Sequence, residues 1–128
     1  MAVQFKMVPK QNNIASPPEV KYFPCAISQG EVNLDDLAKI VAGRSTMSRA
    51  DCYGVIMGLS EVIGEQLADG RIVRIDNLGT FSLSLQGTAA DAPESLGKSN
   101  IKKAKMLFQP SRAIKEVLKT IVFKRIRE

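Results

Sequence analysis

Basic side chains are concentrated in the last quarter of this 128-residue sequence. Residues 98–128 hold ten Lys or Arg and two carboxylates, a net charge of +8, whereas residues 1–97 have a net charge of −3. Lysine and arginine displace counterions from phosphates and donate hydrogen bonds to their oxygens. Such an asymmetry indicates contact with a polyanionic surface, either nucleic acid or membrane.

The residues needed for most catalytic sites are missing from the sequence. Histidine is absent, so there is no His-based triad, imidazole metal ligand or histidine general base. Cys25 and Cys52 lack metal-site spacing, and no glycine-rich phosphate loop or nucleophile elbow occurs. We therefore expect no enzyme, no cofactor and no small-molecule substrate, with carboxylate or lysine chemistry as a minor alternative.

A strand pattern precedes the basic region. In residues 74–85, RIDNLGTFSLSL, apolar Phe81 and Leu83 alternate with Ser82 and Ser84. Arg74 lies between two apolar residues of the preceding run and is expected to point away from the core. The pattern predicts one apolar and one small, polar face, and residues 101–108 predict the next strand.

Two helices are predicted before these strands. Asn33 and Ser48 are typical N-caps, and Gly43 and Gly70 end the two segments. Their apolar positions recur at helical spacing: Leu34, Leu37, Ala38 and Val41 in the first, and Cys52, Val55, Ile56, Leu59, Val62, Ile63 and Leu67 in the second. Two short helices cannot bury this surface alone, so we expect a partner chain. Three glycines in the second helix predict a close helix–helix contact: Gly54, Gly58 and Gly64.

The two ends of the chain complete the predicted order. Residues 1–31 contain two strand-like runs around a Pro/Asn/Ser-rich linker, and Pro24 places the second run at a sheet edge. Because this segment carries few charges, a structural clamp or edge cover is favoured over a binding arm. After Pro110, Ser111 is predicted to cap a last helix. Residues 124–128 are interpreted as the solvated end of this helix and not as a specific contact. The order predicts an α+β fold with an antiparallel sheet segregated from the helices.

Residues 32–85 and 98–121 resemble the HU/IHF family of bacterial DNA-bending proteins. The resemblance lies in a leucine-rich helix, a Ser-capped second helix, GRIV at residues 70–73, NLGTF at residues 77–81 and MLFQPSRAIKEVLK at residues 106–119. It implies an IHF-like fold: two N-terminal helices, a three-stranded antiparallel sheet with a β-arm, and a C-terminal helix. An extra N-terminal β-hairpin or strand pair would precede it. The implied boundaries are a β extension at 1–31 and an HU-like DNA-binding domain at 32–128, with residues 86–100 as the arm or loop connection.

The resemblance also implies an intertwined homodimer with a basic saddle on double-stranded DNA. If Phe108 points inward like its family counterpart, Lys103 and Lys105 share the outer face with Arg74, Ser82 and Ser84. The candidate DNA-binding residues are Arg74, Ser82, Ser84, Lys98, Lys102, Lys103, Lys105, Arg112 and Lys115. A solvated strand edge is the alternative interpretation of the lysines at 102, 103 and 105.

The predicted function is non-enzymatic, largely sequence-independent DNA binding by a nucleoid-associated, architectural protein. We expect a cytoplasmic, nucleoid-associated homodimer without membrane contact. The arm departs from the family, because Gln86 and Gly87 stand where its cations begin, and Pro93 lies between Asp91 and Glu94. Pro93 is therefore interpreted as a turn proline and not as a wedge between base steps. The alternative function is an HU-fold structural or protein-interaction module with little DNA affinity.

Overall fold

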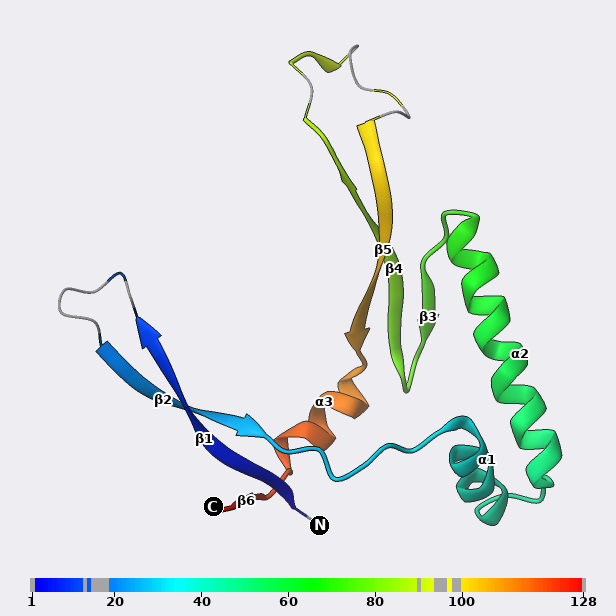
Figure 1. The fold of residues 1–128 in the computed structure, drawn as a ribbon. Helices are drawn as coiled ribbons and strands as arrows, with labels where there is room; N and C mark the ends of the chain where they lie inside the picture. Colours follow the sequence, from blue (N-terminus) through cyan, green and yellow to red (C-terminus); the bar gives the residue numbers. More distant parts are fainter. Residues whose placement is uncertain are drawn as a thin grey trace. The chain divides into compact units, whose positions relative to one another are not determined.

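The computed structural model describes residues 2–12, 14, 19–89, 91–93, 97 and 100–127 (Figure 1). The described chain has three helices and two three-stranded sheets, which confirms the predicted α+β class. It divides into two compact units, one formed by Met1–Val32 with Leu118–Glu128 and the other by Asn33–Val117. Each unit is described separately below.

Capping side chains set where the two long helices begin. In α1 (Leu34–Gly43), Oδ1 of Asn33 accepts from the backbone N–H of Asp36 at 2.9 Å, and the Asp36 carboxylate accepts from the Asn33 N–H at 3.2 Å. In α2 (Arg49–Ala68), Oγ of Ser48 accepts from the Asp51 N–H at 3.1 Å. These bonds satisfy orphan donors of the first turn, so both predicted N-caps are confirmed.

The second unit also contains an antiparallel sheet in the order β3-β4-β5. Its strands are β3 (Val73–Ile75), β4 (Gly79–Gly87) and β5 (Ile101–Pro110). The β3–β4 turn is closed by a 2.9 Å hydrogen bond from the Leu78 N–H to the Ile75 carbonyl. Gly79 follows at φ +153°, and a Cβ there would collide with the Gln109 carbonyl and the Phe108 ring. Glycine is required here because β4 and β5 approach each other too closely for a side chain.

The first unit holds the other sheet, in the order β2-β1-β6. β1 (Val3–Asn12) pairs antiparallel with β2 (Glu19–Ala26) and parallel with β6 (Phe123–Arg125). The strand β2 is an edge strand, as Pro24 predicted. The interpretation of residues 124–128 as a helix end was wrong. α3 (Arg112–Lys119), capped by Ser111, ends before them, and the chain then forms β6 along β1.

Few apolar side chains are buried within the described residues. Ala38, Cys52 and Leu67 form the buried core, whereas Val55 is 59% exposed and Leu59 is 45% exposed. A Cβ added at any of the three α2 glycines would meet no atom within 4 Å, so the predicted close helix contact is not made within this part of the chain. The apolar positions predicted at helical spacing therefore do lie on helices. The described residues, however, cover only one side of α2.

Gly79→Ala should destabilise the protein, because the new Cβ has no space between β4 and β5 and alanine disfavours this backbone conformation. We expect a loss of about 2–4 kcal/mol in the free energy of unfolding, measured by urea denaturation. Gly43→Ala is the control, since a Cβ there meets nothing within 4 Å. Equal stability of the Gly79→Ala and Gly43→Ala variants would contradict the close approach.

Candidate nucleic-acid interface

The strand register sorts the sheet residues of the second unit onto two faces. In antiparallel pairs, directly opposite residues project from the same face. Ser84 is opposite Lys105, Gln86 is opposite Lys103, and Arg74 is opposite Thr80. One face, named here the hydroxyl face, therefore carries Arg74, Thr80, Ser82, Ser84, Gln86, Lys103, Lys105, Leu107 and Gln109. The predicted grouping of Arg74, Ser82, Ser84, Lys103 and Lys105 on one face is confirmed.

The electrostatic character of the hydroxyl face is uniform. β3, β4 and β5 contain no Asp or Glu, so the positive charges of Arg74, Lys103 and Lys105 meet no carboxylate within the sheet. Both lysines are exposed, and neither forms an ion pair with the rest of the described chain. The small hydroxyls of Ser82 and Ser84 beside them can donate to an anionic oxygen.

The opposite face of the sheet is apolar. Phe81 and Phe108 are directly opposite, and their ring centroids lie 4.9 Å apart at an interplanar angle of 48°. Farther along the strands, Leu85 is 62% exposed and Met106 is 58% exposed. The two rings contact each other near the β3–β4 turn, but Phe108 is itself 43% exposed, so this face is open along much of the ribbon.

β4 and β5 continue as a two-stranded ribbon past the end of β3, and Figure 1 shows this extension clearly. Beyond the last strand pair, the Thr88 N–H donates to the Asn100 carbonyl at 2.8 Å, and the Asn100 side-chain amide donates to Thr88 Oγ1 at 3.1 Å. Asn100 Oδ1 also accepts from the Gly97 N–H at 3.0 Å. Asn100 thus holds the two sides of the connection together where the strands end.

Lys102 is not part of the regular alternation. Gln86 is opposite Lys103 and the next residue, Gly87, is opposite Ile101, so Lys102 is the extra residue of a β-bulge. A Cβ at Gly87 would collide with the Asn100 carbonyl, so glycine is needed on the strand facing the bulge. The bulge separates Lys102 from the regular cation row of the hydroxyl face.

The remaining candidates lie elsewhere. Arg112 and Lys115 are exposed in the first turns of α3, three residues apart on one side of the helix. No contact described for them joins them to the hydroxyl face. Lys98 lies outside the described residues. Gln86 and Gln109 share the hydroxyl face but were not among the predicted residues. Extending the serine alternation along β4 would have found Gln86, and extending the Lys103–Lys105 alternation along β5 would have found Gln109.

A family model supplies the assignment. The model of the HU-HIG family, described as an HU domain fused to a wHTH, Ig or glycine-rich motif, matches residues 1–125. The chain belongs to the HU-HIG family. The resemblance to HU proteins inferred from the sequence is thereby confirmed.

Solved structures share the fold of this HU-HIG chain. A protein from Bacteroides vulgatus ATCC 8482 for which DNA binding is proposed has a TM-score of 0.70 at 13% identity, over 98% of the chain. The chain spans 50% of that protein's length. Anabaena HU, in a cocrystal structure with DNA, has a TM-score of 0.54 at 16% identity, over 69% of the chain and 98% of Anabaena HU. No curated protein sequence matches the chain.

The described residues of the HU-HIG chain hold no group of three or more Cys, Asp or Glu side chains that could bind a metal ion. Their helices are too short or too polar to cross a bilayer.

Replacing both exposed lysines in Lys103→Gln/Lys105→Gln should leave the HU-HIG chain's stability within about 0.5 kcal/mol of the wild type. Both side chains are solvent-exposed and make no ion pair in the described part of the chain. Thermal unfolding followed by circular dichroism measures the change. A melting temperature lowered by more than about 5 °C would show that the two lysines support the fold.

Proposed function

We propose that this chain binds double-stranded DNA through the hydroxyl face, as a non-enzymatic protein with little sequence preference. The observation that carries the proposal is the alignment of Arg74, Lys103 and Lys105 with Ser82 and Ser84 on a face without carboxylates. The HU–DNA cocrystal of Anabaena HU, which has the same fold, supports the choice of DNA over other polyanions.

The chemistry of this face suits the phosphate backbone. Lysine is a compact point charge that neutralises a phosphate and releases its counterions, which makes the affinity strongly dependent on salt. Serine hydroxyls donate to phosphate oxygens and fix the position of the strand. Contacts of this kind carry no base information, so binding through them tolerates many sequences.

The β4–β5 ribbon would serve as the arm of an IHF-like arrangement, with the domain boundary at residue 32 predicted from the sequence. The cations of its strands lie on β5, while the connection contains two carboxylates, Asp91 and Glu94, and one lysine, Lys98. A carboxylate is repelled by the negative potential of the minor groove. The proposal therefore gives the arm a positioning role along the backbone and gives Pro93 no role as a wedge.

We also propose that the binding form is a homodimer associated with the nucleoid of the cell. Val55, Leu59 and Val62 on α2 are 45–59% exposed, and Leu85 and Met106 of the sheet are open as well. Full burial of one such side chain is worth about 1.5–3 kcal/mol. A second copy that covers these positions would supply the core that the single chain lacks, and it would also explain the three α2 glycines.

A protein-interaction module is the second candidate. The two acidic residues in the arm connection, Asp91 and Glu94, and the open apolar side chains favour it, since large exposed apolar patches mark interaction sites. The two candidates differ in whether phosphate contacts dominate binding, and a DNA titration separates them.

The DNA test uses Lys103→Glu/Lys105→Glu and a random-sequence duplex titrated between 50 and 200 mM salt. Loss of two phosphate contacts should make the slope of log affinity against log salt concentration less negative by about 1.8. The affinity at 50 mM salt should fall at least tenfold. Lys39→Glu, an exposed charge reversal on α1, is the matched control and should bind like the wild type. Absence of wild-type binding at 50 mM salt would refute the proposal in favour of the interaction module.

The dimer test uses Leu59→Asp, which places a carboxylate among the exposed apolar residues of α2. Sedimentation equilibrium should show a dimer for the wild type and a monomer of about half the mass for the variant, because burying an unpaired charge costs several kcal/mol. Glu61→Gln, an exposed neighbour, should remain dimeric. A monomeric wild type at micromolar concentration would contradict the proposed assembly.

A further inference from the structure

The β2-β1-β6 sheet also has a face dominated by lysine. Lys10 of β1 is directly opposite Lys21 of β2, and Gln4 of β1 is directly opposite Lys124 of β6. Lys6 has the same strand parity as Gln4 and Lys10, so it lies between them on the same side of β1. Four lysines from three strands therefore share one side, named here the lysine face: Lys6, Lys10, Lys21 and Lys124.

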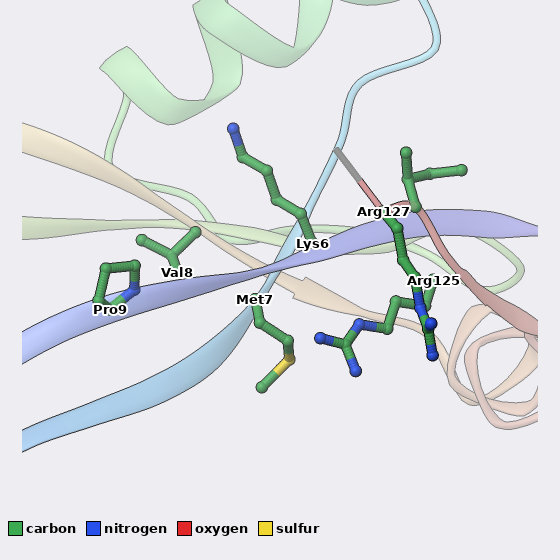
Figure 2. A pocket seen from close by; sticks show the side chains of 7 residues that line it. Lys6, Met7, Val8, Pro9, Arg125 and Arg127 are labelled. Carbon is green, nitrogen blue, oxygen red and sulfur yellow. The ribbon is translucent and has the colours of Figure 1, made fainter.

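The opposite side of the same sheet has a different character. Figure 2 shows Lys6 on one side of β1 and the side chains of Met7, Arg125 and Arg127 on the other. Farther along that other side, an apolar hollow of about 450 Å³ is lined by Val3, Phe5, Pro24, Ala26 and Phe123. This opposite side also carries two positive charges, Arg125 and Arg127, but beside an apolar hollow. Its arginines can therefore serve as the control for the lysines on the other side of the same sheet.

Lys10 and Lys21 are only weakly neutralised within the described strands. Among the residues of β1, β2 and β6, Glu19 is the carboxylate that the register places on this face, at the far end of β2, and its oxygen lies 3.9 Å from Lys21 Nζ. Both side chains are well exposed, 69% for Lys21 and 59% for Glu19, so this pair is weak. Lys10 Nζ lies 5.3 Å from the centre of the Phe23 ring, a contact that orients the ammonium group and leaves its charge in place.

The direct cross-strand pairing of Lys10 and Lys21 is unfavourable in the free protein, because like charges opposite each other in a sheet destabilise it. When a polyanion is bound, its negative charge would attract both lysines, and the Lys10–Lys21 pair would then stabilise the complex. The pair is therefore better explained by a negatively charged ligand than by the stability of the sheet.

The free strand edges do not suit another strand. The Val3 N–H donates to the Val122 carbonyl at 2.8 Å, so odd residues of β1 direct their N–H groups toward the β6 side. Past the three residues that pair with β6, the same edge of β1 is open, and Pro9 there has no N–H to donate. On the outer edge of β2, Pro24 lies at a position whose N–H would point outward, so this edge also lacks a donor there. A partner therefore approaches the faces of this sheet, not its edges.

We propose that the lysine face is a second contact surface for the phosphate backbone of duplex DNA, separate from the hydroxyl face. The inference rests on the proposed function, since it assumes that duplex DNA is the ligand of the protein. Lys10, Lys21 and Lys124 are compact point charges on one side of this sheet and can contact phosphates without reading bases. The sequence favoured a structural role for residues 1–31 because that segment alone carries few charges. The pairing of β6 with β1 adds Lys124 and creates the face.

The test compares the two sides of one sheet in the full chain. Lys10→Gln/Lys21→Gln removes two charges from the lysine face, and Arg125→Gln/Arg127→Gln removes two charges from the opposite side. On a random-sequence duplex of 40 base pairs, the slope of log affinity against log salt concentration should be less negative by about 1.8 for the lysine variant than for the wild type. Its gain in affinity between 200 and 50 mM salt should then be about twelvefold smaller than that of the wild type. The arginine variant should keep the wild-type dependence.

Each outcome has a separate meaning. Wild-type binding with an unchanged Lys10→Gln/Lys21→Gln variant would overturn the lysine face and leave the proposed function intact. An equal effect of both double variants would also overturn it, because total charge and not this face would then control binding. A lysine-face effect combined with a neutral Lys103→Glu/Lys105→Glu variant would refute the hydroxyl face alone. Binding to vesicles with 30% anionic lipid that is stronger than binding to the duplex would assign the face to a membrane instead. Circular dichroism melting of every variant checks that the fold is retained.

Discussion

The pairing of β4 with β5 is the constraint on which the candidate interface depends. The side-chain period of a strand is two, so a slip of β4 by one residue would move its serines to the apolar side and Phe81 to the opposite side. Close contact between Gly79 and the Phe108–Gln109 segment excludes any larger residue at the start of the pairing, and Gly87 and Asn100 anchor its far end. Two glycines at the ends of β4 therefore fix which side is cationic.

The same register leaves the chain with a second requirement. A sheet with one polar side must cover its other side, but the described residues leave Phe108 43% exposed and Leu85 62% exposed on that side. α2 has apolar residues on two sides, one of which packs within the chain through Cys52 and Leu67. DNA contact and self-association are thus linked in this account. In the proposed function, a second copy would cover the apolar side and leave the polar side to face a duplex.

Local signals in the sequence predicted much of this structure. Asn33, Ser48 and Ser111 identify the three helix starts through side-chain chemistry, and the alternation in residues 79–86 identifies both faces of β4. Three features had no local signal. β6 forms by pairing with a strand about 120 residues earlier in the chain, the bulge at Lys102 depends on the partner strand, and the exposure of Val55 depends on how little of α2 the chain covers. Family membership supported the fold, but the positions of the cations came from the strand register.

Lysine footprinting measures directly whether the hydroxyl face contacts DNA. The protein would be acetylated at 50 mM salt with and without a saturating random-sequence duplex, and the modification of each lysine would be quantified by mass spectrometry. The account predicts that Lys103 and Lys105 are protected by DNA, whereas Lys39 on α1 reacts equally in both samples. Protection of Lys39 with full reactivity of Lys103 and Lys105 would show that the hydroxyl face does not bind DNA.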